Sequence, residues 1–108
     1  MSAATLSCRL EDAALDLNDA CVKHTGAVVA VNEARQELEV ARATRLCNGV
    51  EEKNEAQREA FIRLELDSLY TVLASAETAL TEARCELDCS RVLFEVARYS
   101  VRAFEVPT

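Results

Sequence analysis

Apolar residues recur at alternating steps of three and four along two long stretches of the chain. This average spacing of 3.5 residues is typical of the seam of a coiled coil, because it keeps one face of a helix apolar. The first stretch contains Leu10, Ala13, Leu17, Ala20, Ala27, Val31, Ala34, Leu38 and Ala41. The second contains Leu66, Leu69, Leu73, Ala76, Leu80, Ala83, Leu87, Ser90, Phe94, Ala97, Val101 and Phe104.

The composition agrees with an all-α fold in a single helical domain spanning residues 1–108. The chain has only two glycines and one proline, too few for a sheet with many turns. We expect one helix over about residues 5–47, a loop at 48–53 and a second helix over about 54–105. Gly49 stands where a left-handed helix stop is expected, and Asn54 with Gln57 forms a capping pattern.

The short loop predicts that the two helices fold back on each other as a long antiparallel, coiled-coil-like hairpin. Folding about the middle of the loop places large side chains mostly against small ones, although a shift of one heptad pairs almost as well. The pairs expected in the first register include Leu38 with Ile62, Ala20 with Leu80, Ala13 with Leu87, and Leu6 with Phe94. Gly26 lowers helix propensity in the middle of the first helix. A three-helix arrangement with a break near Gly26 is therefore the structural alternative.

A second apolar row lies away from the predicted seam. A helix pair that is apolar on two faces favours self-association, most simply as a homodimer in which two hairpins form a four-helix bundle. We therefore predict an oligomer or partner interface. Its residues are Leu15, Val22, Val29, Cys85, Val92, Val96 and Tyr99.

The formal charge of -7 disfavours direct nucleic-acid binding, since an acidic surface repels phosphate. No apolar run is long enough to span a membrane. The five cysteines are scattered through the helical pattern, which favours reduced thiols and a cytoplasmic location. The expected partners are a second copy of the chain and a protein of unknown identity.

Little in the sequence predicts chemistry. His24 takes a seam position, and its seam neighbours are alanine and leucine, which supply no nucleophile or acid. Cys21, His24, Cys85 and Cys89 have donor types that suit zinc, but His24 is expected to face the seam while Cys85 and Cys89 face outwards. We therefore expect no cofactor, no metal and no enzymatic activity.

The segment from Val50 to Ala60, followed by heptads such as Glu77 to Arg84, resembles a group of small phage and prophage proteins. Their pattern is a glycine-containing turn, K-N-x-x-x-R and a long Ala/Leu/Glu helix. The resemblance implies a small mobile-element protein, located in the host cytoplasm, in a group without settled biochemistry. From the architecture we expect a module that acts by docking on a protein partner. Together with the resemblance, this suggests an inhibitor of a host defence complex, such as an anti-CRISPR protein, or of a nucleic-acid-processing complex, because carboxylates can mimic phosphate charge.

Two alternatives remain open. One is a structural or assembly role for a coiled-coil protein. The other is a secreted helical hairpin of the Trp-x-Gly type, which the architecture resembles, although the turn here reads Cys47-Asn48-Gly49 without tryptophan.

Overall fold

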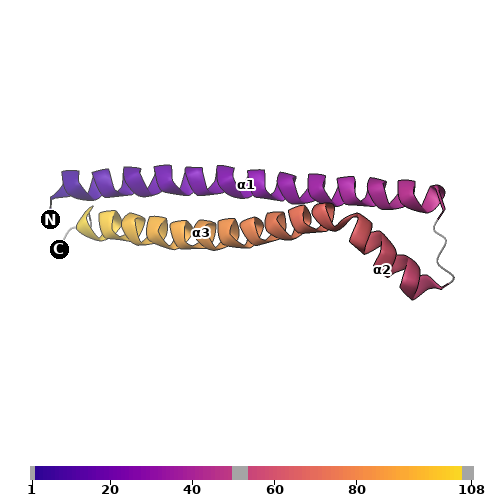
Figure 1. Ribbon diagram of the computed structural model, residues 1–108. Coiled ribbons are helices and arrows are strands. Elements are labelled where there is room, and N and C mark those ends of the chain that lie inside the picture. Colours follow the sequence, from indigo (N-terminus) through magenta and orange to yellow (C-terminus); the bar gives the residue numbers. More distant parts are fainter. Residues whose placement is uncertain (1, 50–53, 106–108) are drawn as a thin grey trace. The chain divides into compact units, whose positions relative to one another are not determined.

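The computed structural model describes residues 2–49 and 54–105, and within these ranges it contains three helices and no strand (Figure 1). They are α1 (Ala3–Cys47), α2 (Glu55–Glu65) and α3 (Asp67–Glu105). The prediction of an all-α fold is confirmed. The chain forms two compact units, one of Met1–Gly26 with Thr81–Thr108 and the other of Ala27–Leu80.

The first predicted helix is continuous. α1 runs through Gly26 without interruption, so the alternative of a break at this residue is wrong. A Cβ at Gly26 would meet no heavy atom within 4 Å, which shows that the glycine is not required by a close approach. The predicted stop is confirmed, because Gly49 has a φ of 83°. The Arg45 guanidinium adds a hydrogen bond of 2.6 Å to the Gly49 carbonyl oxygen.

The second predicted helix is interrupted, so the expectation of one helix over 54–105 is wrong. Leu66 leaves helical geometry with φ −101° and ψ 20°, and it separates α2 from α3. Its N–H still donates to the Ile62 carbonyl at 2.9 Å, while its own carbonyl accepts from the Tyr70 N–H at 3.1 Å. Asp67 follows in the first turn of α3, where negative charge suits the helix dipole. At the start of α2 the predicted cap is confirmed, since Asn54 Oδ1 accepts from the Gln57 N–H at 2.8 Å.

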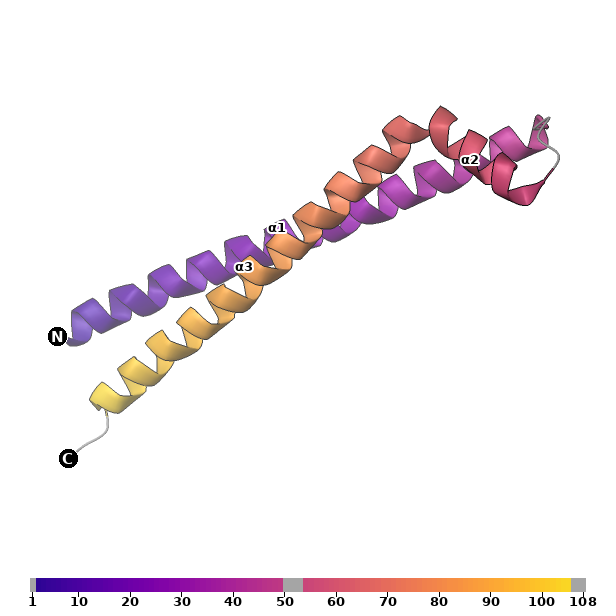
Figure 2. The ribbon, with the colours of Figure 1, turned by 60° about the horizontal axis from the view of Figure 1, so that its bottom comes forward.

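In the unit formed by residues 1–26 and 81–108, α1 and α3 lie side by side and run in opposite directions (Figure 2). Leu6 lies beside Val101 and Phe104, while Lys23 Nζ contacts Glu86 Oε2 at 2.9 Å. The first register predicted from the sequence pairs Leu6 with Phe94. In the structure the two helices of this unit are shifted from that register by one heptad. Both seams repeat every seven residues, which is why a shift of one heptad preserves the match of large against small side chains. The buried core of this unit is Leu6, Ala20, Ala83 and Leu87.

In the unit of residues 27–80 the two most deeply buried side chains are Val31 of α1 and Ile62 of α2. Ala34 and Leu38 of α1 are buried as well, at 6% and 7% exposure. α2 is held here by Ile62 and by the partly buried Arg42. Arg42 donates to Glu59 Oε1 at 2.8 Å and to the Tyr70 hydroxyl at 2.7 Å, so it links α1 to α2 and to the start of α3.

The hydrogen bonds between Arg42 and Glu59 also set the ionisation of both groups. The bond to Arg42 lowers the pKa of the Glu59 carboxyl, and the bond to Glu59 is the main cause that raises the pKa of Arg42. Nearby, Arg45 pairs with Glu65 and lies over the Phe61 ring at 5.3 Å. Arg63 lies over the Tyr70 ring at 4.7 Å, so one cation–π contact spans the break at Leu66. These contacts fix α2 even though only one of its side chains is buried.

Candidate binding surface

A second apolar seam runs along α3. Its members recur at steps of four, three, four, three and four, the spacing by which one helix packs against another. They are exposed, with Val92 at 62%, Val96 at 57% and Tyr99 at 57%, and both cysteines are free thiols. We name this surface the outer seam of α3. It comprises Cys85, Cys89, Val92, Val96, Tyr99 and Ala103.

The position of the outer seam follows from helix geometry. We call the two apolar rows found in the sequence, from Leu10 to Ala41 and from Leu66 to Phe104, the inner seam. Val92 precedes the inner-seam residue Phe94 by two positions, and Tyr99 precedes Val101 in the same way. Two residues correspond to about 200° around a helix, so these side chains face away from the segment of α1 that packs on Phe94 and Val101. The outer seam is therefore left uncovered within its own unit, while the inner seam is occupied by α1.

The residues beside the outer seam differ on its two sides. On one side Leu93 adds a further apolar side chain that is 63% exposed. On the other side lie three charged residues, Asp88, Glu95 and Arg102. Glu95 pairs with Arg98 at 2.7 Å, and Asp88 pairs with Arg91 at 3.6 Å. Two guanidinium groups, those of Arg98 and Arg102, lie over the Tyr99 ring at 5.8 Å and 5.9 Å from its centroid.

The outer row of α1 is narrower. Leu15 and Val22 are 63% and 66% exposed and lie seven residues apart, but polar residues occupy the neighbouring positions where a seam would continue. Those neighbours are Glu11, Asp12, Asn18 and Asp19. A single row of this kind forms an apolar strip that is too narrow for a partner helix to pack on.

The structure therefore does not bring all the predicted interface residues together. Leu15 and Val22 lie on the side of α1 away from α3, whereas Val92 and Tyr99 lie on the side of α3 away from α1, so the two sets do not share a face within this unit. Cys85, Val92, Val96 and Tyr99 share one surface. Val29 is 48% exposed and belongs to the unit of residues 27–80.

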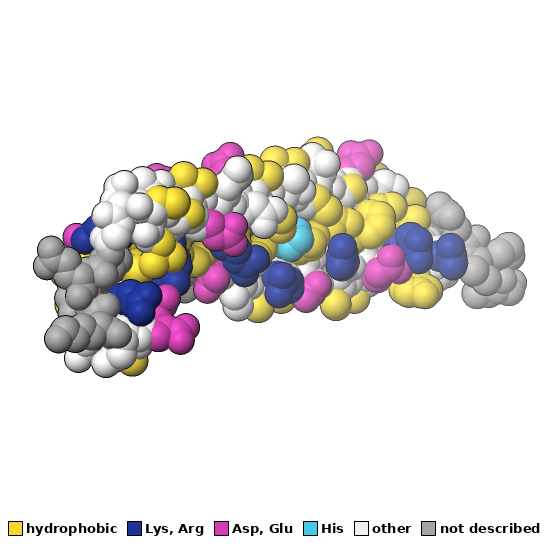
Figure 3. All heavy atoms as spheres, turned by 90° about the vertical axis from the view of Figure 1, so that its right-hand side faces the viewer, with side chains coloured by type: hydrophobic (Ala, Val, Ile, Leu, Met, Phe, Trp, Pro, Cys, Tyr) yellow, Lys and Arg dark blue, Asp and Glu magenta, His cyan; other side chains and the backbone are white. Residues whose placement is uncertain are grey.

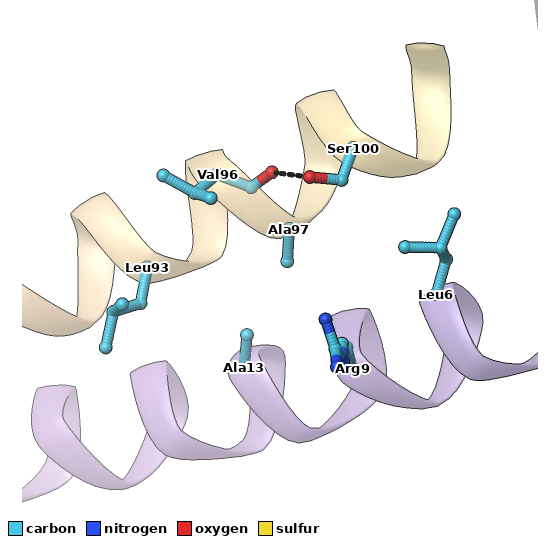
Figure 4. Close-up of a pocket in the computed structure, with 7 residues that line it drawn as sticks. All are labelled: Leu6, Arg9, Ala13, Leu93, Val96, Ala97 and Ser100. Atoms are coloured by element: carbon cyan, nitrogen blue, oxygen red, sulfur yellow. Dashed lines mark hydrogen bonds between the residues drawn. The ribbon is translucent and has the colours of Figure 1, made fainter. Parts of the chain in front are cut away.

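A shallow hollow of about 300 Å³ borders the outer seam (Figure 4). Ala13 and Ala97 point toward each other across it, and their small side chains leave the space between α1 and α3 unfilled. Leu93 points from α3 toward α1 at one end of the hollow, and Leu6 stands at the other. Val96 belongs both to this hollow and to the outer seam, so a side chain packed on the seam could reach into the hollow.

A second hollow, of about 330 Å³, is polar. Lys23 of α1 crosses it and donates to both Glu86 carboxylate oxygens at 3.0 Å and 2.9 Å, and Asp16 and Asp19 line its wall. Cys89 is its only member from the outer seam. Both side chains of this ion pair are exposed, so it contributes little to stability, and it links α1 to α3 at this point of the register.

The candidate chemical groups do not converge on one site. His24 is half-buried in the inner seam, whereas Cys21, Cys85 and Cys89 are exposed. Among the described residues, no three His, Cys, Asp or Glu side chains are placed to hold a metal ion. Within the same ranges, no helix is long and apolar enough to cross a membrane.

Other exposed apolar side chains were not predicted from the sequence. In the unit of residues 27–80, Val40, Leu46, Leu64 and Val72 are 60%, 48%, 78% and 52% exposed. They lack the repeated spacing of the outer seam. Figure 3 shows hydrophobic side chains interspersed with charged ones on the face that it presents, an arrangement that is common on protein surfaces.

Comparisons of the chain with protein-family models, with curated proteins and with solved structures found no match.

Proposed function

We propose that this protein is a non-enzymatic protein-binding module, and that its binding surface is the outer seam of α3. The observation that carries the proposal is the heptad spacing of six exposed positions on a helix whose opposite face is already packed on α1. Such spacing has a use only if a second helix packs on it, since isolated exposed apolar residues need no period.

The exposed apolar surface supports the proposal energetically. Val92, Leu93, Val96 and Tyr99 are each more than half exposed. Covering the exposed part of one such side chain contributes about 1 kcal/mol, so a partner helix gains several kcal/mol from these four residues. This gain can offset part of the translational and rotational entropy that association costs.

Site-specific photo-crosslinking tests the proposal directly. Val92→benzoylphenylalanine places a photoreactive group at the centre of the outer seam, and Val22→benzoylphenylalanine is a matched control with nearly the same exposure on α1. Irradiation of cells that express each variant should give protein adducts at position 92 and none at position 22. Equal adducts at both positions, or none at position 92, would contradict the proposal.

One observation favours a second candidate function, that of an assembly protein. Leu15 and Val22 lie on the side of α1 that is opposite to the outer seam of α3. A protein with two different apolar binding surfaces on opposite sides can assemble into open chains. Val22→Asp separates the two functions. It should leave a protein-binding module unchanged, but it should shorten the assemblies of a scaffold, as measured by light scattering across a range of concentrations.

We also keep the phage-encoded inhibitor as a proposal. It is supported by the formal charge of -7 and by the Asp16 and Asp19 carboxylates on the wall of the polar hollow. An anti-CRISPR-type inhibitor of this kind should retain a purified nuclease complex on a column in low salt and release it as the salt concentration rises. Retention that is unaffected by salt would count against charge mimicry.

A further inference from the structure

We infer that the outer seam of α3 binds the outer seam of a second copy of this protein, with the two α3 helices antiparallel and related by a two-fold axis that passes between Val92 and Val96. The inference rests on the proposed function and goes beyond it, because it names the partner, the orientation and the register. It follows from how the side chains of this segment would meet their own copies.

The sizes of the side chains match in this register. A two-fold axis that passes between Val92 and Val96 brings Val92 of each copy against Val96 of the other. It places Cys89 opposite Tyr99 and Cys85 opposite Ala103. The central layer then combines two valines and the next combines the large Tyr99 with the small Cys89, which fills the space evenly, while the outermost layer combines two small side chains.

The charges beside the seam match in the same register. Asp88 of each copy comes beside Arg102 of the other, so the two-fold axis creates this attractive pair twice. On the opposite side Leu93 meets Leu93, and both of these side chains are 63% exposed in the single chain. The two Glu95 residues also meet at the axis, but each already has Arg98 at 2.7 Å to balance its charge.

A parallel arrangement is less favourable. It stacks each seam residue on its own copy, so the two Tyr99 rings meet in one layer and the small cysteines meet in others. It also places Asp88 beside Leu93 and Glu95 beside Ser100, which pairs charges with uncharged neighbours. The antiparallel arrangement is therefore the one that the described side chains support.

A charge-reversal series measured by sedimentation velocity tests the pairing. Asp88→Arg and Arg102→Asp each replace two attractive pairs with two repulsive ones, and the double variant restores both attractions. Each single variant loses two exposed attractive pairs and gains two repulsive ones, so it should weaken the dimer by at least about fourfold. The double variant should recover to within about twofold of the original dissociation constant.

Cysteine crosslinking tests the orientation. In a background with Cys8, Cys21 and Cys47 replaced by serine, Tyr99→Cys should form a disulfide dimer on oxidation, because position 99 meets Cys89 of the other copy. The same background with Tyr99 retained should form little, since Cys85 and Cys89 each meet a residue without a thiol. In a parallel dimer both proteins should form the disulfide dimer, because identical cysteines then lie within bonding distance. Crosslinking of the background that retains Tyr99 would therefore contradict the antiparallel orientation.

The outcomes also separate this inference from the function on which it rests. A monomeric wild-type chain, or a double charge variant as weak as the singles, overturns self-pairing. If adducts at position 92 then contain a different protein, the binding module stands and only its partner was wrong. If position 92 gives no adduct at all, both proposals fail.

Discussion

Ile62 is the anchor of α2, and its truncation should unfold this helix selectively. The side chain is 0% exposed and is the only buried one in α2, which has 11 residues. A helix of this length is not stable alone in water, since isolated helices shorter than about 12–15 residues are marginal. α2 therefore depends on Ile62, on the Asn54 cap and on the pairing of Arg42 with Glu59.

The magnitude follows from the burial. Replacing a buried isoleucine with alanine typically costs about 2–5 kcal/mol, which combines the lost transfer free energy with the cost of the cavity. A loss of about 3 kcal/mol corresponds to an increase of roughly a hundredfold in the population of the open state, because each 1.4 kcal/mol is a factor of about ten. The Asn54 cap, worth about 1 kcal/mol, cannot compensate.

Amide hydrogen exchange measures the population of the open state of α2 at each residue. In Ile62→Ala the amides of α2 should exchange about a hundredfold faster, while those near Leu87 should change little. Leu64→Ala is the matched control, because Leu64 is on the same helix and is 78% exposed. Its effect should stay within about 0.5 kcal/mol. Equal acceleration in both variants, or none in Ile62→Ala, would refute the argument that one buried residue holds α2.

Three further predictions concern the backbone and the ionisable groups. Gly26→Ala should raise the free energy of unfolding by about 0.5–1 kcal/mol in a urea titration, because the position is helical and has room for a Cβ; a loss of stability would contradict the helical geometry. Gly49→Ala should lower it by about 1 kcal/mol, because a φ of 83° strains any residue with a Cβ; no change would show that the left-handed stop is not formed. The Glu59 carboxyl has a lower pKa in the folded protein than in the unfolded chain, because it bonds to Arg42. This bond stabilises α2 fully at any pH above the pKa of Glu59 in the unfolded chain, and it is lost as the pH falls through the pKa of Glu59 in the folded protein. α2 should therefore loosen below about pH 4. Glu59→Gln should remove this pH dependence in a circular-dichroism titration, whereas Arg42 stays charged throughout because this pH range lies far below the pKa of a guanidinium group.

Much of the fold could be predicted from periodicity. The steps of three and four identify the inner seam, and the buried Ala20, Ala83 and Leu87 all belong to it. The helix stop at Gly49 and the N-cap at Asn54 could also be predicted from the sequence, because each depends on one or two residues. These features are local, and local signals can be read from a single sequence.

The register and the helix break required information that periodicity does not contain. A heptad repeat is unchanged by a shift of seven residues, so only specific contacts such as Lys23 with Glu86 select one register. The break at Leu66 interrupts a pattern that reads as continuous. Asp67 and Ser68 favour the start of a new helix, and they were the signal that could have located it.

The binding surface could be predicted only in part. The spacing of Val92, Val96 and Tyr99 indicated a second apolar row, but it did not show that this row belongs to α3 alone. The helical geometry shows which surface each row occupies. Leu15 of α1 and Val92 of α3 each lie about 200° around their own helix from the residues that pack the two helices together. Two rows on the outer sides of an antiparallel pair cannot share one face.

Light scattering after size exclusion shows whether this protein associates through the outer seam of α3. Under reducing conditions we expect a dimer for the wild-type chain and for Val22→Asp, and a monomer for Val92→Asp. If Val92→Asp has the same mass as the wild-type chain, or if Val22→Asp is a monomer, the outer seam of α3 is not the surface of association.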